Sequence, residues 1–199
     1  MKKILLAAFI SASLFGYAQD YSVPAASPRQ KVEQQFSISK VSIDYGRPAV
    51  KGRKIFGELV PYGKVWRAGA NSNTKITFGQ PVLFGGKEVS GNSFGLHIIP
   101  QEKEWKIVLN KDSNAWGSYS YDEKLNVVEV SVPTEKLASK KEYFEMTLDV
   151  VDENTLTLVI SWDFTKVQVP IKVQKPEVVA KMAEKLKEAK QIERDSNKK

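Results

Sequence analysis

Apolar and polar residues alternate along most of this chain, and only a few residues separate the alternating stretches. Successive side chains of a β-strand point to opposite faces, so this period of two is typical of strands with one buried face. The Gly85-Gly86 and Asp152-Glu153-Asn154 connections are short enough to join only antiparallel strands, because parallel strands need a long crossover. The sequence therefore predicts an all-β, antiparallel fold of about nine strands.

The first alternating stretch changes phase in its middle. Phe36 and Ile38 follow one phase, and the apolar residues from Val41 to Tyr45 follow the other. This pattern indicates either one long strand with a bulge or two short strands. We expect a turn at Asp163-Phe164 between the last two strands. The other predicted strands cover residues 74–78, 82–84, 94–99, 105–110, 127–132, 143–151, 156–162 and 166–173.

These strands predict an antiparallel β-sandwich, jelly-roll-like, or an open barrel, over residues 27–174. Residues 175–199 differ, because apolar residues recur there at helical spacing after Pro176, which suits a first helical position. We predict an amphipathic helix with a frayed tail from Ser196. Its expected role is to cover a sheet edge or face, and the alternative is to bind a partner or a membrane surface. Its apolar residues are Val179, Met182, Leu186, Ala189 and Ile192.

Residues 1–18 have the pattern of a secretory signal peptide. Lys2-Lys3 is followed by an apolar run over residues 4–15 and by small residues in Gly16-Tyr17-Ala18. The run is too short to span a bilayer, which needs about 20 apolar residues. We therefore expect cleavage after Ala18, a linker over residues 19–26 and an exported mature chain without a transmembrane segment. The expected destination is the periplasm, and secretion is the alternative.

Composition narrows the classes of function. The formal charge of +7 includes Lys2 and Lys3, so the mature chain would carry +5, which is small and dispersed. A nucleic-acid partner is therefore not expected, since such proteins concentrate basic residues on one surface. The chain has no Cys and one His, which argues against a disulfide framework and a zinc site. A Ca²⁺ site at Asp152-Glu153-Asn154 is possible in principle, but a turn is the better interpretation. We expect no metal and no cofactor.

Residues 27–79 are rich in Gly, Pro and Arg and also apolar, which predicts a structured loop packed on the sandwich. Several runs, here and later in the chain, are distinctive: Ser27-Pro28-Arg29, Tyr45-Gly46-Arg47-Pro48, Lys51-Gly52-Arg53, Ile55-Phe56-Gly57, Leu59-Val60-Pro61-Tyr62-Gly63, Val65-Trp66-Arg67-Ala68-Gly69-Ala70-Asn71, Phe94-Gly95-Leu96, Ile99-Pro100, Glu104-Trp105, Asn110-Lys111, Trp116-Gly117 and Tyr119. Together they resemble a bacterial family called domain of unknown function 2911. The resemblance covers about residues 27–173 and implies an exported, β-rich protein of Bacteroidota-like bacteria, without an established activity. Where the family has Leu-Pro-Ala-Gly-Thr-Tyr, this chain has Val89-Ser90-Gly91-Asn92-Ser93-Phe94.

Four arginines in the irregular segment have two possible roles. Each lies beside a Pro, a Gly or an aromatic residue, and a guanidinium suits bidentate binding of carboxylate or phosphate. If they converge, they form a site for an anionic ligand. In the alternative they bind loop carbonyls and pair with Asp44, Glu58 or Glu104. Asn71 could likewise donate either to a ligand or to the backbone. The four are Arg29, Arg47, Arg53 and Arg67.

The aromatic residues and the single histidine provide further candidates. Trp66, Trp105 and Trp162 are predicted to face the core. Rings in the 114–122 run could instead stack on a sugar; these are Trp116, Tyr119 and Tyr121. Alternation places His97 opposite Leu96 and Ile98, which predicts a half-exposed strand histidine.

The run from Gly91 to Gly95 matches the Gly-x-Ser-x-Gly pattern of serine hydrolases, but it enters a strand, so a glycine-rich hairpin turn is favoured. A binding module for a glycan or an anionic metabolite is the preferred function. A structural or assembly protein comes second, and a hydrolase using two carboxylates such as Asp122 and Glu104 comes third. We do not favour an enzyme. The hypothetical ligand-binding residues are Arg47, Arg53, Arg67, Asn71, His97, Trp116 and Tyr119.

The signal-peptide interpretation makes a direct prediction about processing. The exported protein should begin at Gln19, because Ala18 is the last small residue before the polar part of the chain. The mass of the intact purified protein measures this. A mature protein that retains Met1 would remove the basis for export.

Overall fold

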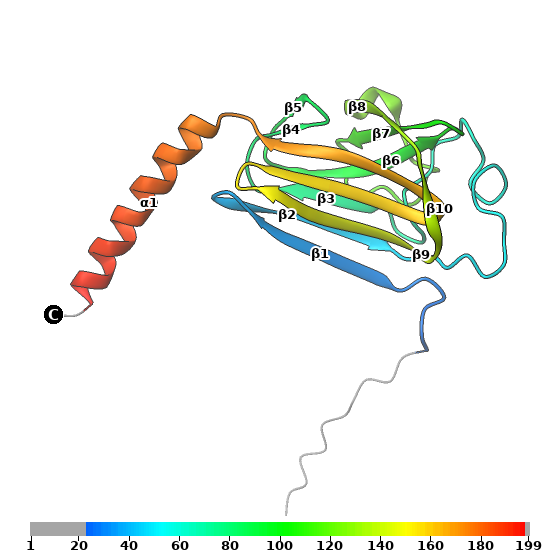
Figure 1. Ribbon diagram of the computed structural model, residues 1–199, viewed down its shortest axis with the longest axis horizontal. Coiled ribbons are helices and arrows are strands. Elements are labelled where there is room, and N and C mark those ends of the chain that lie inside the picture. Colours follow the sequence, from blue (N-terminus) through cyan, green and yellow to red (C-terminus); the bar gives the residue numbers. More distant parts are fainter. Residues whose placement is uncertain (1–22, 198–199) are drawn as a thin grey trace, which may run out of the picture.

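The computed structural model describes residues 23–197, so the predicted signal peptide lies outside the described residues. The described chain forms ten strands followed by one long helix (Figure 1). A short 3₁₀ helix, η1, covers Glu123–Leu125. The strands are β1 (Arg29–Phe36), β2 (Ser39–Gly46), β3 (Thr74–Phe78), β4 (Val82–Phe84), β5 (Lys87–Val89), β6 (Ser93–Pro100), β7 (Glu104–Asn110), β8 (Asn126–Pro133), β9 (Glu135–Asp152) and β10 (Thr155–Val173), and the helix is α1 (Pro176–Ser196).

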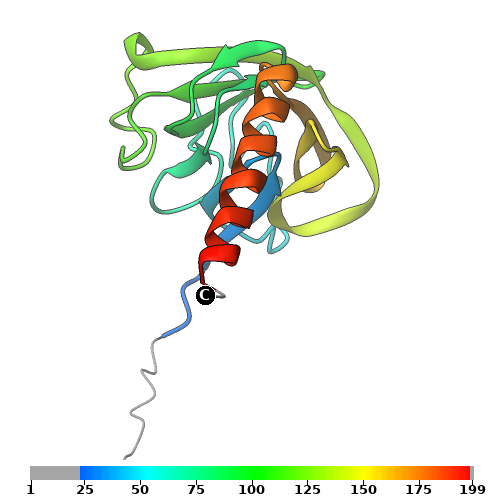
Figure 2. The ribbon, with the colours of Figure 1, turned by 90° about the vertical axis from the view of Figure 1, so that its left-hand side faces the viewer.

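The strands form two antiparallel sheets. The larger has the order β1-β2-β3-β6-β7-β8, and the smaller has the order β5-β4-β10-β9. The view along the strands shows two separate layers, with α1 outside both (Figure 2). The all-β antiparallel sandwich with a C-terminal helix is therefore confirmed, and the sheets do not close into a barrel.

One expectation at a change of phase is confirmed and one is wrong. Of the two alternatives for the phase change after Phe36, the structure has two strands, joined by a turn at Ser37-Ile38 in which Ser37 has a φ of 54°. The turn expected at Asp163-Phe164 is wrong, because β10 runs through these residues without interruption. The pairing of β10 with β9 shifts register on both sides of Asp163, whose φ is 53°. A bulge thus absorbs the phase change that suggested a turn.

The short connections agree better with the sequence. The Gly85-Gly86 hairpin joins β4 to β5, and Glu153-Asn154 joins β9 to β10. The structure has more strand than the sequence predicts in two places. Strand β9 begins at Glu135, well before the predicted start, and the three-residue β5 was not predicted. Both additions are mostly exposed, so they lack the apolar alternation that identifies a half-buried strand.

Residues 47–73 close one end of the sandwich, opposite α1 (Figure 1). Val50, Ile55 and Val60 from this segment belong to the core, which confirms a structured loop packed on the sandwich. Five aromatic rings fill the space where the segment meets both sheets. Trp66 stacks on Trp162 of β10, with ring centroids 5.7 Å apart and planes at 18°. The other three are Phe56, Trp105 of β7 and Phe144 of β9.

Backbone hydrogen bonds fix this segment to both sheets. Trp66 and Ile98 of β6 exchange two N–H···O bonds of 2.8 Å, and Val50 N–H donates to the Glu142 carbonyl of β9 at 2.7 Å. Gly46 at the end of β2 lies directly against the Ala70 carbonyl, where a Cβ would collide with the backbone. This close approach requires glycine at position 46. The loop is therefore held as rigidly as the strands that it joins.

Helix α1 extends away from the sandwich (Figures 1 and 2). Within α1, Val179 packs against the core, and the apolar residues Val178, Met182, Leu186 and Ile192 are 45–68 % exposed. The expected role of covering a sheet is therefore wrong. The apolar faces of the two sheets already cover each other, so the sandwich has no core surface for α1 to complete. Within residues 23–197, no helix is both long and apolar enough to cross a membrane.

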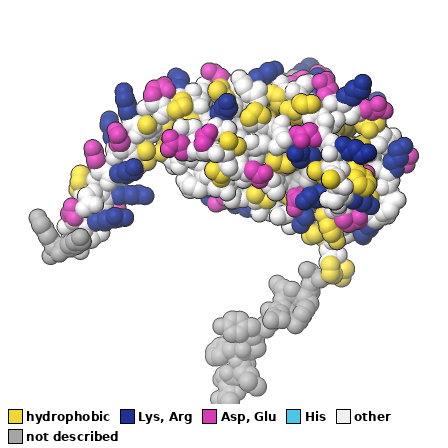
Figure 3. Space-filling view, viewed as in Figure 1, with side chains coloured by type: hydrophobic (Ala, Val, Ile, Leu, Met, Phe, Trp, Pro, Cys, Tyr) yellow, Lys and Arg dark blue, Asp and Glu magenta, His cyan; other side chains and the backbone are white. Residues whose placement is uncertain are grey.

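Charged side chains of both signs are interspersed over the face shown in Figure 3, including the visible side of α1. The described chain also has exposed ion pairs, such as Lys54 with Glu58 at 3.2 Å and Lys106 with Glu129 at 3.1 Å. Pairs of this kind contribute about 0–1 kcal/mol each. On this face the surface charge does not form the dense basic stripe that a nucleic-acid interface needs.

Deleting residues 176–199 should leave the sandwich folded, because α1 contributes one partly buried side chain to the core. The circular dichroism signal of helix should disappear, and the melting temperature should fall by less than about 5 °C. Far-ultraviolet spectra and thermal unfolding of the two proteins measure this. Substantial helix after the deletion, or a truncated protein that does not fold, would contradict the described architecture.

Candidate functional site

One cavity lies where residues 47–73 meet β10, and we call it the Arg67 cavity. Its volume is about 220 Å³, and the rings of Trp66 and Trp162 form part of its wall. Two cationic side chains, Arg53 and Arg67, reach it from different parts of the same loop. The complete lining is Ser27, Pro48, Arg53, Leu59, Val60, Trp66, Arg67, Gly69, Ala70 and Trp162.

Two hydrogen-bond donors at this cavity are buried without a partner among the described residues: Nε of Arg67 and Nε1 of Trp162. Trp66, in contrast, donates from Nε1 to the Gly69 carbonyl at 3.0 Å. Buried donors are nearly always satisfied by protein, water or ligand, because leaving one unpaired costs about 1–3 kcal/mol. The Arg67 cavity therefore presents two donors that an acceptor could satisfy.

The other three arginines of the irregular segment have the alternative, structural role of bonding to carbonyls and carboxylates of the protein. Arg29 Nε donates to Asp44 Oδ1 at 2.8 Å, and its other nitrogens contact backbone carbonyls. Arg47 donates to the Phe144 carbonyl at 3.2 Å and lies over the Tyr143 ring. Arg53 donates to two carbonyls of its own loop, at 2.6 and 3.0 Å. Three of the four arginines are thus bonded within the protein, and only Arg53 and Arg67 line the cavity.

Asn71 also has a structural contact, since its Nδ2 donates to the Ser27 carbonyl at 3.1 Å. Its φ is 63°, in the left-handed region that asparagine tolerates better than most residues. Asn71 therefore fixes the path of the loop beside the cavity, and its neighbour Ala70 lines the wall.

The Trp66–Ile98 pairing determines which way Arg67 points. The Trp66 ring lies in the core, and side chains alternate along an extended segment, so Arg67 emerges on the outer side of the larger sheet. Continuing the antiparallel register places Arg67 next to His97 of β6. Two predicted ligand residues are thereby neighbours, although 29 positions separate them in the sequence.

His97 is fully buried, at 0 % exposure, so the expected half-exposed histidine is wrong. Alternation predicted the outward direction, but not that the connection from β7 to β8 would cover this face. The Tyr121 ring lies 4.9 Å from the imidazole, centroid to centroid. Burial lowers the pKa of His97 to about 4, against a smaller opposing effect of the Asp112 carboxylate and the Gly95 carbonyl.

Polar side chains gather around Gly95 on this outer face. A Cβ on Gly95 would lie 2.5 Å from the Asp112 carbonyl oxygen, 2.6 Å from Asn73 Nδ2 and 3.3 Å from His97 Cε1. Only glycine permits this approach. Neither the amide of Asn73 nor the ring nitrogens of His97 have a hydrogen-bond partner within residues 23–197. We call Asn73, His97 and Asp112 the outer polar cluster.

Of the three predicted aromatic platforms, Trp116 and Tyr119 flank Gly117-Ser118, where the chain approaches Arg67. Trp116 is 69 % exposed and Tyr119 is 94 % exposed. Gly117 lies next to both the Tyr119 ring and the guanidinium, because a Cβ placed on it would be 3.4 Å from the ring and 3.9 Å from Arg67 Nη1. Tyr121 is half-buried instead, and its hydroxyl accepts from Asn126 Nδ2 at 2.7 Å.

The alternative hydrolase sites do not assemble. The Ser93 hydroxyl is bonded to the Thr77 hydroxyl at 2.7 Å, and His97 is four residues further along the same strand with a buried ring. The Asp122 backbone lies at the end of β7, where its carbonyl accepts from Asn110 at 2.8 Å. Glu104 begins the same strand, about 20 Å away at about 3.3 Å per residue. Neither arrangement brings a base or a second carboxylate to a nucleophile.

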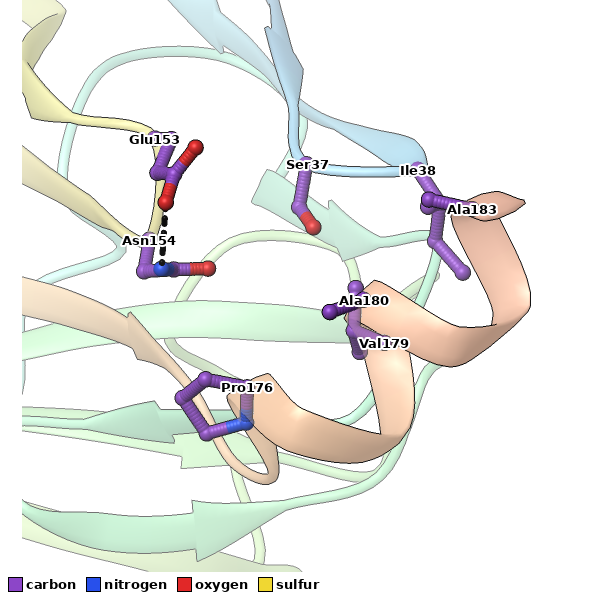
Figure 4. Close-up of a pocket in the computed structure, with 8 residues that line it drawn as sticks. All are labelled: Ser37, Ile38, Glu153, Asn154, Pro176, Val179, Ala180 and Ala183. Carbon is purple, nitrogen blue, oxygen red and sulfur yellow. Dashed lines mark hydrogen bonds between the residues drawn. The ribbon is translucent and has the colours of Figure 1, made fainter. Parts of the chain in front are cut away.

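A larger hollow of about 340 Å³ lies where α1 leaves the sandwich. Figure 4 shows that α1 contributes small apolar side chains to it and that Ser37, Glu153 and Asn154 come from two hairpin turns. Asn154 Nδ2 contacts Glu153 Oε1 at 3.5 Å. Neither a cationic side chain nor a buried unpaired donor lines this hollow in the described part of the chain. The Arg67 cavity is therefore the better candidate.

The structure thus brings Arg67, Arg53, His97, Trp116 and Tyr119 to one end of the molecule. Arg47 and Asn71 bond to backbone nearby and do not line the cavity. The sequence does not indicate Asn73, Asp112 or the unpaired donor of Trp162. No short motif contains them, because Asn73 and Asp112 meet through the pairing of β6 with β3 and β7, and Trp162 comes from β10 of the other sheet.

His97 gives a spectroscopic test, because it is the only histidine in the sequence. Its imidazole signal in the untagged protein should not titrate above about pH 5, since burial holds its pKa near 4. Nuclear magnetic resonance of the ring protons against pH measures this. A midpoint near 6.5 would mean that the β7–β8 connection does not cover the ring.

The same pKa determines a pH dependence of stability. The pKa of the imidazole is near 6.5 in the unfolded chain and near 4 in the folded protein. The contribution of neutral His97 to the free energy of unfolding is therefore fully present above pH 6.5 and is lost as the pH falls toward 4. The loss should be on the order of 3 kcal/mol. Denaturant unfolding of wild type and His97→Gln should show a steeper fall for wild type across this window. Parallel curves would contradict a buried neutral histidine.

The comparisons with known proteins identify a family but no described activity. A family model described as protein of unknown function (DUF2911) matches residues 27–171. That range includes β1 to β9, all but the last two residues of β10, the Arg67 cavity and the outer polar cluster, and it excludes α1. Among curated proteins and solved structures, none is significantly similar to this chain. Because the match covers well over half of the sequence, this protein belongs to the DUF2911 family.

Proposed function

We propose that this protein is an exported binding module of the cell envelope that captures a small anionic ligand at the Arg67 cavity. A metabolite or a glycan that carries an acidic group would fit this description. The proposal combines the signal-like residues 1–18 with the position of one guanidinium. Periplasmic location is the preferred form, and secretion is the alternative.

One observation carries the proposal. Of the four arginines in the irregular segment, Arg67 alone makes no hydrogen bond and no ion pair with any residue in the range 23–197. The other three arginines bond to carbonyls and carboxylates, so acceptors for a guanidinium are present in this region. An arginine that is held among such acceptors, with Nε buried and unpaired, has its binding capacity free for another molecule.

The size and composition of the cavity limit the ligand. A volume of about 220 Å³ is below the usual range of about 300–1,000 Å³ for drug-sized ligands, so a small molecule or one residue of a chain fits. Two indole rings and the donors of Arg67 and Trp162 line it. An anionic group beside a compact apolar portion satisfies both kinds of surface.

The other two candidate functions have less support. An assembly role would use the exposed apolar side chains of α1, but nothing in the structure shows what covers them. A hydrolase would need two groups that act on one bond, and the candidate pairs lie apart or are occupied. Binding therefore remains the preferred function.

A matched pair of substitutions separates binding from stability. Arg67→Met keeps the aliphatic stem and removes no hydrogen bond, so the melting temperature should stay within about 3 °C of wild type. Arg53→Met removes two bonds to carbonyls and should cost about 1–3 kcal/mol, or several degrees. Thermal unfolding measures both.

Calorimetric titration with a panel of small carboxylates and phosphates tests the function itself. Wild type and the distant control Arg194→Met should bind at least one of these anions, and Arg67→Met should lose that binding. A large loss of stability in Arg67→Met, together with no binding by wild type, would establish a structural role for Arg67 instead.

A further inference from the structure

The surroundings of Arg67 restrict the class of ligand further, and this restriction rests on the proposed function. Two exposed aromatic residues flank the Gly117-Ser118 pair, whose glycine lies next to the guanidinium. Trp116 is 69 % exposed and Tyr119 is 94 % exposed, although large rings are usually buried. Exposed rings and an unpaired cationic group on one surface suit a ligand that offers both a ring face and a negative charge.

The chain builds this juxtaposition from distant segments. Arg67 follows the Trp66–Ile98 pairing, whereas Trp116 and Tyr119 belong to the connection between β7 and β8. Gly117, with a φ of 67°, turns the connection so that Arg67 Nη1 and the Tyr119 ring both lie next to it. The outer polar cluster lies under the same connection and contacts it through Asp112.

Each component selects one feature of a ligand. A guanidinium binds a planar carboxylate through two parallel N–H···O bonds, which gives orientation as well as affinity. Aromatic faces favour the C–H-rich face of a ring that is polar at its edges, as a pyranose is. A neutral sugar would leave Arg67 unpaired, and a simple anion such as acetate would leave the rings unused.

We infer that the ligand is an acidic sugar, a pyranose whose carboxylate binds Arg67 and whose ring stacks on Trp116 or Tyr119. The single free guanidinium matches the single charge of a uronic acid. Neither Trp116 nor Tyr119 lines the Arg67 cavity, so the pyranose ring would lie outside it, over the connection that carries these two rings. An acidic polysaccharide would present this residue at a chain end or as a side branch.

The test compares three probes that separate the two features. Methyl β-D-glucuronide and methyl β-D-galacturonide carry the ring and the carboxylate, methyl β-D-glucopyranoside carries the ring alone, and acetate carries the carboxylate alone. Calorimetry or tryptophan fluorescence should show that at least one uronide binds at least tenfold more tightly than the neutral glycoside and acetate. Arg67→Met should remove that advantage over the neutral glycoside.

Aromatic substitutions test the stacking. The double variant Trp116→Ala/Tyr119→Ala should bind the uronide about tenfold more weakly, and its affinity for acetate should not change. The conservative control Trp116→Phe/Tyr119→Phe keeps both rings and should retain most of the affinity. Equal weakening in both double variants would overturn stacking as the cause.

The outcomes distinguish the two proposals. If acetate or phosphate binds in an Arg67-dependent way and neither uronide binds more tightly, the acidic-sugar inference is wrong and the anion-binding function stands. If the panel anions, both uronides and acetate all fail to bind the wild-type protein, both proposals fall. Preferential binding of phosphate over every carboxylate would likewise overturn the sugar inference.

Discussion

The pairing of Trp66 with Ile98 organises the functional end of this molecule. Its two backbone hydrogen bonds of 2.8 Å attach the irregular segment to β6, and the Trp66 ring stacks on Trp162 across the sandwich. The backbone pairing fixes the position of Arg67, and the inward direction of the Trp66 indole requires the next side chain to point outward. Arg67 therefore emerges on the outer side of the sheet beside His97, where the β7–β8 connection covers it in part. This attachment holds the loop that lines the cavity and places Arg67 next to the outer polar cluster.

Unpaired donors at this end are stable because the surrounding structure is rigid. The five aromatic rings, the contact between Gly46 and Ala70, and the carbonyl bonds of Arg29, Arg47 and Arg53 fix the loop in many independent places. The cost of a few unpaired polar atoms, about 1–3 kcal/mol each, is small compared with the burial of such a core. Sites of binding commonly combine a rigid support with groups whose partners are supplied by the ligand.

The sequence predicts the fold well where burial produces alternation. Strands β3 and β4 have the predicted bounds, and the hairpin at Gly85-Gly86 is where its residues indicate. The wrong predictions have a common physical origin, since the local periodicity of a sequence does not report its tertiary contacts. A bulge at Asp163 has the same phase change as a turn, and α1 has the pattern of a covering helix but stands away from the sheets. Among the candidate residues, the chemistry of Arg67 is apparent from the sequence. The burial of His97 and the proximity of Asn73 to Asp112 are not, because they depend on strand pairing and on the β7–β8 connection.

The account depends on one claim, that the fold holds the Arg67 guanidinium free for a ligand. The five arginine Nε–H groups give separate signals in nuclear magnetic resonance, so a titration with methyl β-D-glucuronide can observe each of them. The account predicts that the Arg67 signal shifts with saturation, that the Trp162 indole N–H signal shifts with it, and that the signals of Arg29 and Arg47 stay in place. An Arg67 signal that stays fixed at every uronide concentration, in a folded protein, would contradict the central claim.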